Sequence, residues 1–186
     1  MSSLLDPVAF GRIPLPRVLF DANVLFQAAA TRFLLGGARA GLYRAIWTAE
    51  IVDEARRNLT EARRLGGLAA LDQILQFVRD ALVEPASGRQ AELFPATHVD
   101  DRHVLAAAVK HSAAVLVTDN VRDFDVSEAA SGNVVIATAR EFASHLARRD
   151  ADAMTRFIER VPPERFERYV AALKRQFPEA MDALEL

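Results

Sequence analysis

The sequence contains no cysteine and almost no lysine: of its 23 basic residues, only Lys110 and Lys174 are lysines. The absence of cysteine excludes a disulfide framework, a thiolate zinc site and a cysteine nucleophile. No apolar run approaches the roughly 18 residues that span a bilayer. The first residues have neither a basic n-region nor a long apolar h-region, so we expect no membrane segment and a cytoplasmic location.

An excess of positive charge is also lacking. The net charge is −2 over 186 residues, which gives no overall basic field for a nucleic acid. The acidic residues are unevenly placed, because residues 99–146 hold seven of them and only four basic ones. Arginine suits bidentate contacts to phosphate, although genomic codon bias produces the same preference. Length and composition predict one globular domain with room for an appendage.

Short apolar segments alternate with amphipathic ones along residues 17–146, which predicts an α/β fold with a parallel sheet. Asn23 can cap a first helix that weakens at Gly36-Gly37, and Thr48 can cap a second. Thr138 and Glu141 form a capping-box pattern. The expected strands are 17–20, 43–47, 81–83, 115–117 and 134–136, and the expected helices are 24–35, 48–59, 67–80, 102–111 and one that begins at 138.

Residues 147–186 show no strand pattern. Pro162-Pro163 separates two expected helices, and the second carries apolar residues on one face. This pair can form an additional packing layer or a groove that docks a partner. The sequence thus divides into a lead at 1–16, an α/β domain at 17–146 and a helical extension at 147–186.

Carboxylates recur at the carboxyl ends of the expected strands or at helix starts. In open α/β sheets ligands bind at this edge, so we expect these groups to lie close together. Two carboxylates 4 Å apart repel by about 4 kcal/mol at an effective dielectric of 20, so such a cluster requires protons or a cation. Oxygen ligands favour Mg²⁺ or Mn²⁺, which promote phosphodiester cleavage. Any one of these residues can equally be an N-cap. They are Asp21, Asp100, Asp101, Asp119, Asp123 and Asp125.

Four motifs carry a resemblance to a known family. They read LFDANVL at 19–25, WTAEIVDEARRNL at 47–59, VDDRHVLAAAV at 99–109 and VLVTDNVRDF at 115–124. In this order they closely resemble the PIN-domain ribonucleases and look most like the VapC-type toxins of toxin–antitoxin pairs. The likeness covers residues 17–142. It implies a three-layer α/β/α fold around four or five parallel strands, Mg²⁺- or Mn²⁺-dependent cleavage of tRNA or rRNA, a cognate antitoxin and a homodimer.

The resemblance also implies residue roles. Asp101 is preferred to Asp100, since Val104 and Ala106 then fall in the family's register. In the fourth motif Asn120 occupies the usual acidic position, so either Asp119 or Asp123 supplies the last carboxylate. The expected catalytic residues are Asp21, Glu54, Asp101 and Asp119; the expected metal ligands are Asp21, Asp101, Asp119 and Asp123; and the expected substrate contacts are Asn23, Arg102, Thr118, Asn120 and Arg122.

Other functions fit the sequence less well. A receiver-type phosphoacceptor domain needs an acidic pair just after its first strand and a lysine after its fifth. A D-x-D phosphatase needs an acid where Asn23 stands. An inert PIN-fold interaction module is favoured only by Asn120. The four histidines, at 98, 103, 111 and 145, fit no common zinc spacing, so we expect them in loops or on helix surfaces.

Overall fold

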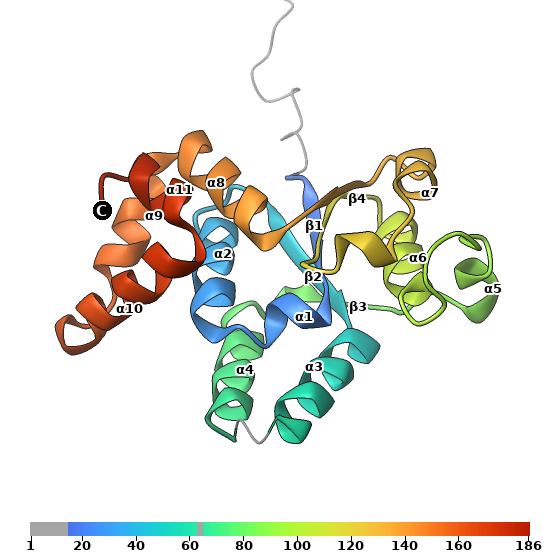
Figure 1. The fold of residues 1–186 in the computed structure, drawn as a ribbon, viewed down its shortest axis with the longest axis horizontal. Coiled ribbons are helices and arrows are strands. Elements are labelled where there is room, and N and C mark those ends of the chain that lie inside the picture. The colour runs from blue at the N-terminus through green and yellow to red at the C-terminus, as the bar shows by residue number, and fades with distance from the viewer. Residues whose placement is uncertain (1–14, 63–64) are drawn as a thin grey trace, which may run out of the picture.

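The structure, a computed structural model, describes residues 15–62 and 65–186 (Figure 1). Five strands form one sheet in the order β3-β2-β1-β4-β5, and every neighbouring pair is parallel. The predicted parallel sheet is therefore confirmed, with strand ends displaced by at most two residues. The strands are β1 (Arg17–Phe20), β2 (Arg44–Thr48), β3 (Leu82–Val83), β4 (Ala113–Val117) and β5 (Val135–Ala137).

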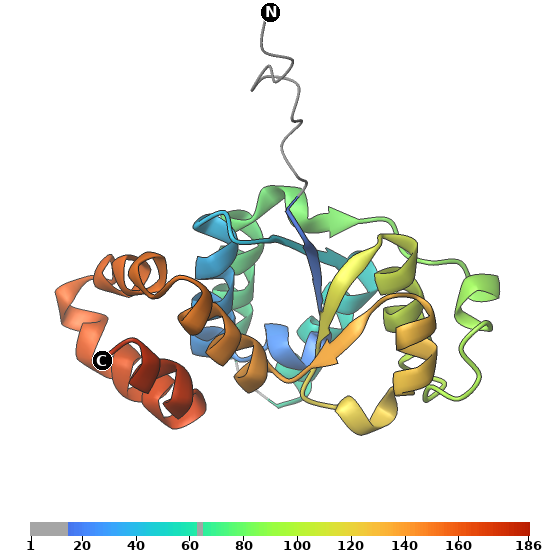
Figure 2. The same ribbon diagram turned by 90° about the horizontal axis from the view of Figure 1, so that it is seen from above.

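Helices cover both faces of this sheet. On one face lie α2 (Ala28–Arg39), α4 (Leu65–Phe77) and α8 (Ala139–Arg149), and on the other lie α6 (Arg102–Lys110) and α7 (Val126–Ser131) (Figure 2). The inner strands β1 and β2 are largely buried between the two helical layers, as expected for parallel strands, whereas the edge strands β3 and β5 are partly exposed. The three-layer α/β/α arrangement predicted from the sequence is confirmed.

Shorter elements complete the edge where the strands end. The helix α1 (Ala22–Leu25) follows β1 directly, and α3 (Ala49–Glu61) follows β2 and contacts α1 and α4. The polar loop after β3 contains an unpredicted helix, α5 (Gly88–Ala91), whose capping box joins Ser87 and Gln90. The predicted N-caps Thr48 and Thr138 are both confirmed by side-chain bonds to helix N–H groups. Two 3₁₀ turns are η1 (Arg79–Ala81) and η2 (Val121–Asp123).

The helix predicted after Asn23 is wrong in two respects. Asp21, not Asn23, caps α1, since its Oδ1 accepts a hydrogen bond from the N–H of Ala22. A separate helix, α2, then runs through Gly36-Gly37 instead of weakening there. A Cβ on Gly36 would lie 2.5 Å from the ring of Phe157. This glycine therefore permits close packing of two helices rather than marking a helix end.

The segment after α8 contains three helices, where the sequence predicted two. The additional break falls at Phe177, and the proline that follows it occupies the first helical turn, where its missing N–H is tolerated. The extension contacts α2 and α8 and buries Met154, Ile158 and Leu173 against them (Figure 1). Among the described residues, none of the helices has the length and apolar character needed to cross a bilayer. The three helices are α9 (Ala151–Glu159), α10 (Pro163–Gln176) and α11 (Pro178–Ala183).

Candidate active site

The candidate site lies where the strand order reverses. From the central β1 the chain builds outward to β2 and β3 on one side, and then crosses to β4 and β5 on the other. Ligands in open parallel sheets bind at such a switch point, outside the carboxyl ends of the strands. Asp21 follows β1 and Thr118 follows β4 at this position. A receiver-type domain has the order 2-1-3-4-5 instead, so the observed topology excludes that alternative.

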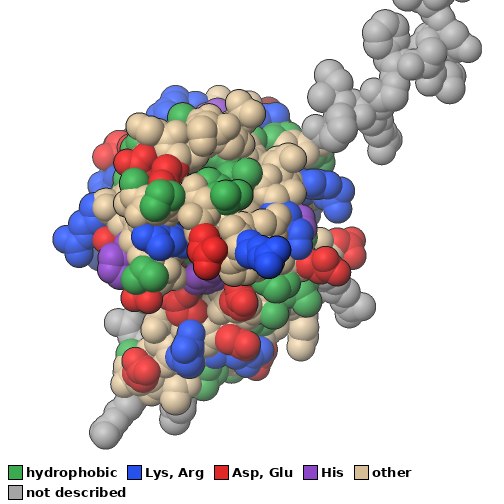
Figure 3. Space-filling model, turned by 90° about the vertical axis from the view of Figure 1, so that its right-hand side faces the viewer, with side chains coloured by type: hydrophobic (Ala, Val, Ile, Leu, Met, Phe, Trp, Pro, Cys, Tyr) green, Lys and Arg blue, Asp and Glu red, His purple; other side chains and the backbone are tan. Residues whose placement is uncertain are grey.

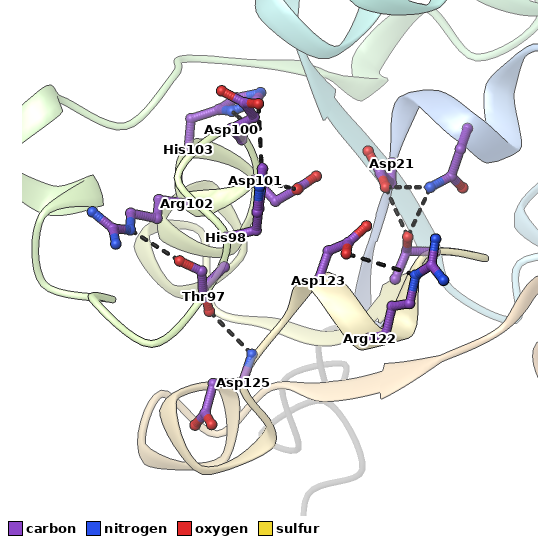
Figure 4. A network of polar contacts seen from close by, with 12 residues as sticks. Asp21, Thr97, His98, Asp100, Asp101, Arg102, His103, Arg122, Asp123 and Asp125 are labelled. Carbon is purple, nitrogen blue, oxygen red and sulfur yellow. Dashed lines mark hydrogen bonds and ion pairs between the residues drawn. The ribbon is translucent and has the colours of Figure 1, made fainter.

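Asp21 is held by a network of hydrogen bonds. Its Oδ2 accepts bonds from Thr118 Oγ1 and Asn23 Nδ2, each at 2.7 Å, and its Oδ1 accepts from the Ala22 N–H (Figure 4). Asn23 Nδ2 also donates to Thr118 Oγ1 at 2.9 Å. Three of the roughly four lone-pair positions of the carboxylate are thus used. The carboxylate is fixed in place and retains one free acceptor position, on Oδ1.

Burial shifts the ionisation of Asp21. Its side chain is 2% exposed, and this desolvation is the main reason why its pKa rises to about 6. The hydrogen bonds from Thr118 and Ala22 oppose the rise, whereas the negative charges of Glu54 and Asp101 add to it. The three carboxylates therefore act on one another across the same region.

Two more predicted acids respond to the same surroundings. Burial raises the pKa of Glu54 on α3, and the charge of Asp101 raises it further while His103 lowers it. Burial also raises the pKa of Asp101, Asp123 adds to the rise, and His98 opposes it. Figure 4 shows the carboxylates of Asp101 and Asp123 turned toward the space beside that of Asp21. The fold thus gathers four of the predicted acids from four separate segments.

Asp119 is placed differently. Its Oδ2 accepts a hydrogen bond from Gln27 Nε2 at 2.9 Å, and its Oδ1 accepts one from the Ala139 N–H at 3.0 Å. The side chain therefore joins the starts of α2 and α8. Of the two candidates for the last carboxylate, Asp123 is the one that faces Asp101 and influences its pKa.

The residues predicted to contact the substrate lie in different surroundings. The guanidinium of Arg102 donates to the carbonyl oxygens of Thr97 and Pro95, at 3.0 and 2.7 Å, and so points away from the acids (Figure 4). Arg122 is 92% exposed and lies 3.9 Å from a carboxylate oxygen of Asp123. Asn120 is exposed, and its backbone N–H donates to Thr118 Oγ1. Arg122 is thus free to meet a ligand, whereas Arg102 holds a loop.

The surface over α5, α6 and α7 carries interspersed charges. Figure 3 views the molecule from this side and shows acidic and basic side chains side by side among the residues drawn in colour. This agrees with the small net charge of the chain. A polyanionic ligand would therefore be held on this side by a few local contacts instead of a broad basic surface.

A second network supports the loop that carries Asp101. Both carboxylate oxygens of Glu128 in α7 accept hydrogen bonds from this loop, from the N–H groups of Ala96 and Thr97 and from the Thr97 hydroxyl. Thr97 Oγ1 in turn accepts from the Asp125 N–H. Thr97 and Glu128 carry no sequence signal for this role, because a glutamate in a first helical turn has an ordinary local role. The contact spans 31 residues, and no local pattern signals it.

Two of the histidines lie closer to the acids than the sequence suggested. His98 Nδ1 is 3.4 Å from Asp101 Oδ2, and His103 Nδ1 is 2.8 Å from the backbone oxygen of Asp100. The other two lie elsewhere: His111 contacts the Glu84 carbonyl and His145 stacks on Phe142. Imidazole groups thus border the acidic cluster on the α6 side.

The donor chemistry of the cluster suits a hard divalent cation. Mutually repelling carboxylates that are buried or half-buried and have raised pKa values are stabilised when a cation balances their charge. In the described part of the chain, however, no three acidic or histidine side chains converge closely enough to form a ligand set. A cation would therefore have to draw the carboxylates together.

Comparison with known proteins identifies the family. A family model described as PIN domain matches residues 17–122, which is more than half of the chain. The comparisons with curated proteins and with solved structures returned no match. The matched region contains Asp21, Glu54 and Asp101 together with the strands that position them. The chain belongs to the PIN-domain family, whose members are generally nucleases.

Proposed function

We propose that this protein is a Mg²⁺- or Mn²⁺-dependent endoribonuclease that cleaves tRNA or rRNA. The observation that carries the proposal is the gathering of Asp21, Glu54, Asp101 and Asp123 at the switch point of a PIN-domain sheet, where burial and mutual repulsion raise the pKa values of the first three. A site that must hold several negative charges next to a polyanion needs a cation to do so.

Each residue of this proposed site has a distinct role. Asp21 and Asp101 would hold the cation, with Asp123 and Glu54 completing the site. A bound divalent cation supplies Lewis-acid assistance to hydrolysis at phosphorus. Thr118 keeps Asp21 in place through a hydrogen bond to Oδ2, which leaves the remaining acceptor position on Oδ1 for the cation.

Arg122 and the end of η2 would contact the substrate. The guanidinium of Arg122 lies beside Asp123 and is exposed, which suits a contact to a phosphate next to the scissile bond. The inert-module alternative rested on Asn120, which stands at the usual acidic position. Asp123 lies three residues later and faces Asp101, so it supports retention of a fourth carboxylate.

The biological role is carried over from the resemblance. VapC-type toxins act in the cytoplasm, are blocked by an antitoxin and pair with themselves. We extend these properties to this chain as part of the proposal: a toxin of a toxin–antitoxin pair, with a cognate antitoxin and a homodimeric assembly as its partners. Size-exclusion chromatography with light scattering tests the homodimer directly.

Cleavage of end-labelled RNA tests the proposed reaction. Purified protein is incubated with tRNA or rRNA in Mg²⁺, Mn²⁺ or EDTA, with Asp21→Asn as the matched variant. We expect discrete cuts that need the cation and disappear in the variant. Cleavage of equal strength in EDTA, or by Asp21→Asn, would contradict the proposal.

Stability should respond to Mn²⁺ in a pH-dependent way. The pKa of Asp21 is about 6 in the folded protein, against 3.8 for an unperturbed aspartate side chain, which represents the unfolded chain. Its contribution to stability is therefore fully present below about pH 4 and is lost as the pH rises through 6. From pH 5 to 7.5 this loss is about 1.4 kcal/mol, or about 3 to 6 °C in Tm.

Differential scanning fluorimetry measures this effect. Without a divalent cation, Tm should fall between pH 5 and pH 7.5, and Mn²⁺ should raise it at pH 7.5 far more than at pH 5, because protons compete with the cation for the carboxylates. Asp21→Asn should flatten the pH dependence. An equal increase with Mn²⁺ at both pH values would contradict the assignment.

The roles of Asp119 and Asp123 can be separated by substitution. Asp123→Asn should reduce cleavage by about 10- to 100-fold, the loss typical of a group that supports a metal site. Asp119→Asn should mainly lower Tm, because its carboxylate joins α2 and α8 through two hydrogen bonds. Cleavage rate and Tm are measured for both variants. The reverse pattern would identify Asp119 as the fourth acid.

A further inference from the structure

A second charged site lies away from the acidic cluster, in a pocket of about 190 Å³ between α2 and α9. Three arginines are among the residues that line it: Arg39 in the last turn of α2, Arg156 in the last turn of α9 and Arg160 directly after α9. The other lining residues are glycine, alanine and phenylalanine, and no carboxylate is among them. The charged residues that line the pocket are therefore all basic.

Among the described residues, these three arginines form no ion pair and donate no side-chain hydrogen bond. Three like charges around one pocket repel each other, and a bound oxyanion would relieve that repulsion. Arginine also offers parallel N–H donors that match two oxygens of a phosphate. In the described part of the chain, arginine ion pairs involve Arg56, Arg122 and Arg140, and arginine side-chain hydrogen bonds involve Arg17, Arg56 and Arg102.

The pocket is built on packed helices. Arg156 and Arg160 are four residues apart and so lie on one face of α9. The absence of a side chain at Gly36 lets the Phe157 ring approach α2, which brings these arginines to the end of that helix. Arg39 is braced by stacking, with its guanidinium carbon 4.2 Å from the centre of the Phe77 ring.

Helix α2 runs from the carboxyl edge of the sheet, where the candidate site lies, to this pocket. Gln27, at the start of α2, donates a hydrogen bond to Asp119 at the carboxyl edge of the sheet. Arg39 lies twelve residues further on, which is about 18 Å along a helix. Arg32 is exposed between them, seven residues before Arg39 and so on the same face of α2. One exposed basic residue, Arg32, thus lies on α2 between the carboxyl edge of the sheet and the pocket.

We propose that the pocket of Arg39, Arg156 and Arg160 binds a backbone phosphate of the RNA substrate, several nucleotides from the bond that is cut. This inference rests on the proposed ribonuclease function. It gives the C-terminal extension a part in substrate binding. The carbonyl ends of α2 and α9 also attract cations, and that role would affect stability but not RNA binding.

RNA binding tests the proposal. Arg156→Ser/Arg160→Ser is made in an Asp101→Asn background, so that labelled tRNA is bound without being cut, and affinity is followed by fluorescence anisotropy against salt. We expect binding about tenfold weaker than in the Asp101→Asn parent, and a salt dependence reduced by about one to two phosphate contacts. Arg165→Ser/Arg168→Ser on α10, with the same loss of exposed charge, should bind like the parent.

Two results would overturn the proposal. Suppose that Arg156→Ser/Arg160→Ser binds RNA with unchanged affinity and salt dependence, and that only its Tm falls. The arginines then stabilise the carbonyl ends of the helices and do not bind RNA. If both double variants weaken binding equally, the effect is one of overall charge. The proposed function is tested separately by cleavage with the native acidic site. If the wild type does not cut RNA and the Asp101→Asn parent does not bind it, the proposed ribonuclease function fails as well. In that case the α10 control variant also shows no binding.

Discussion

Asp101→Asn is expected to lower kcat/KM for RNA cleavage by at least about 100-fold. Loss of a group that merely supports a metal ligand costs about 10- to 100-fold, and Asp101 is proposed here as a ligand itself. Its negative charge helps to raise the pKa values of Asp21 and Glu54, and its own pKa is raised by Asp123. Removing its charge should therefore weaken cation binding. Cleavage rates and Mn²⁺ titrations of the variant measure both effects.

The stability of the same variant should distinguish this loss from misfolding. Burial and Asp123 raise the pKa of Asp101, so the folded protein disfavours its ionised form at neutral pH. The neutral amide should thus leave Tm unchanged or slightly higher in EDTA. Asp100→Asn is the matched control, since that side chain is 86% exposed against 18% for Asp101. A greater loss of activity in Asp100→Asn would mean that the register inferred for this motif is wrong.

Thr118→Val should produce the second large effect, a loss of about 2 kcal/mol in unfolding free energy. Thr118 is fully buried, and its hydroxyl donates to Asp21 while accepting from Asn23 Nδ2 and the Asn120 N–H. Valine fills nearly the same volume but provides neither donor nor acceptor. For a chain of this length the loss corresponds to about 4 to 8 °C in Tm. Thermal unfolding measures it.

The same substitution should alter the ionisation of Asp21. The Thr118 hydroxyl bonds to the charged carboxylate and lowers its pKa, so its removal should move the pKa above 6. Carbon-detected NMR titration of the Asp21 carboxyl follows this change, and the alkaline shift should also appear in the pH profile of cleavage. Thr118→Ser keeps the hydroxyl and should retain the ionisation behaviour. Identical titration of the valine and serine variants would contradict this role of the hydroxyl.

The layers of the fold were predictable because their signals are local. β1 was predicted at its observed bounds, since four residues from Arg17 form an apolar run behind prolines. Thr48 and Thr138 predict helix starts, because a side-chain N-cap involves only the next three residues. The start of β4 was missed, because alanines such as Ala113 have no strong strand preference. Periodicity and capping therefore predict which helices and strands form, whereas the exact ends of the strands depend on their pairing with neighbouring strands.

The arrangement of the site was less predictable, because its contacts span long stretches of sequence. Asn23 looked like a helix cap, yet its amide serves Asp21 and a threonine 95 residues away. Arg102 stands next to Asp101 in sequence, but helix geometry turns it toward the loop carbonyls. Asp119 seemed equivalent to Asp123 until the positions of α2 and α8 were known. Residue types indicated the chemistry, and only tertiary structure could assign their partners.

The pairing of β1 with β4 has a consequence for protein synthesis. β1 leaves the ribosome before its partner β4, which lies almost a hundred residues later, and Thr118 follows β4. A nascent chain therefore carries Asp21 and Glu54 well before it can build the site around them. A fragment that ends before β4 would lack both the central strand pairing and Thr118. The proposed nuclease would thus be harmless to the ribosome that makes it until most of its domain has emerged and folded.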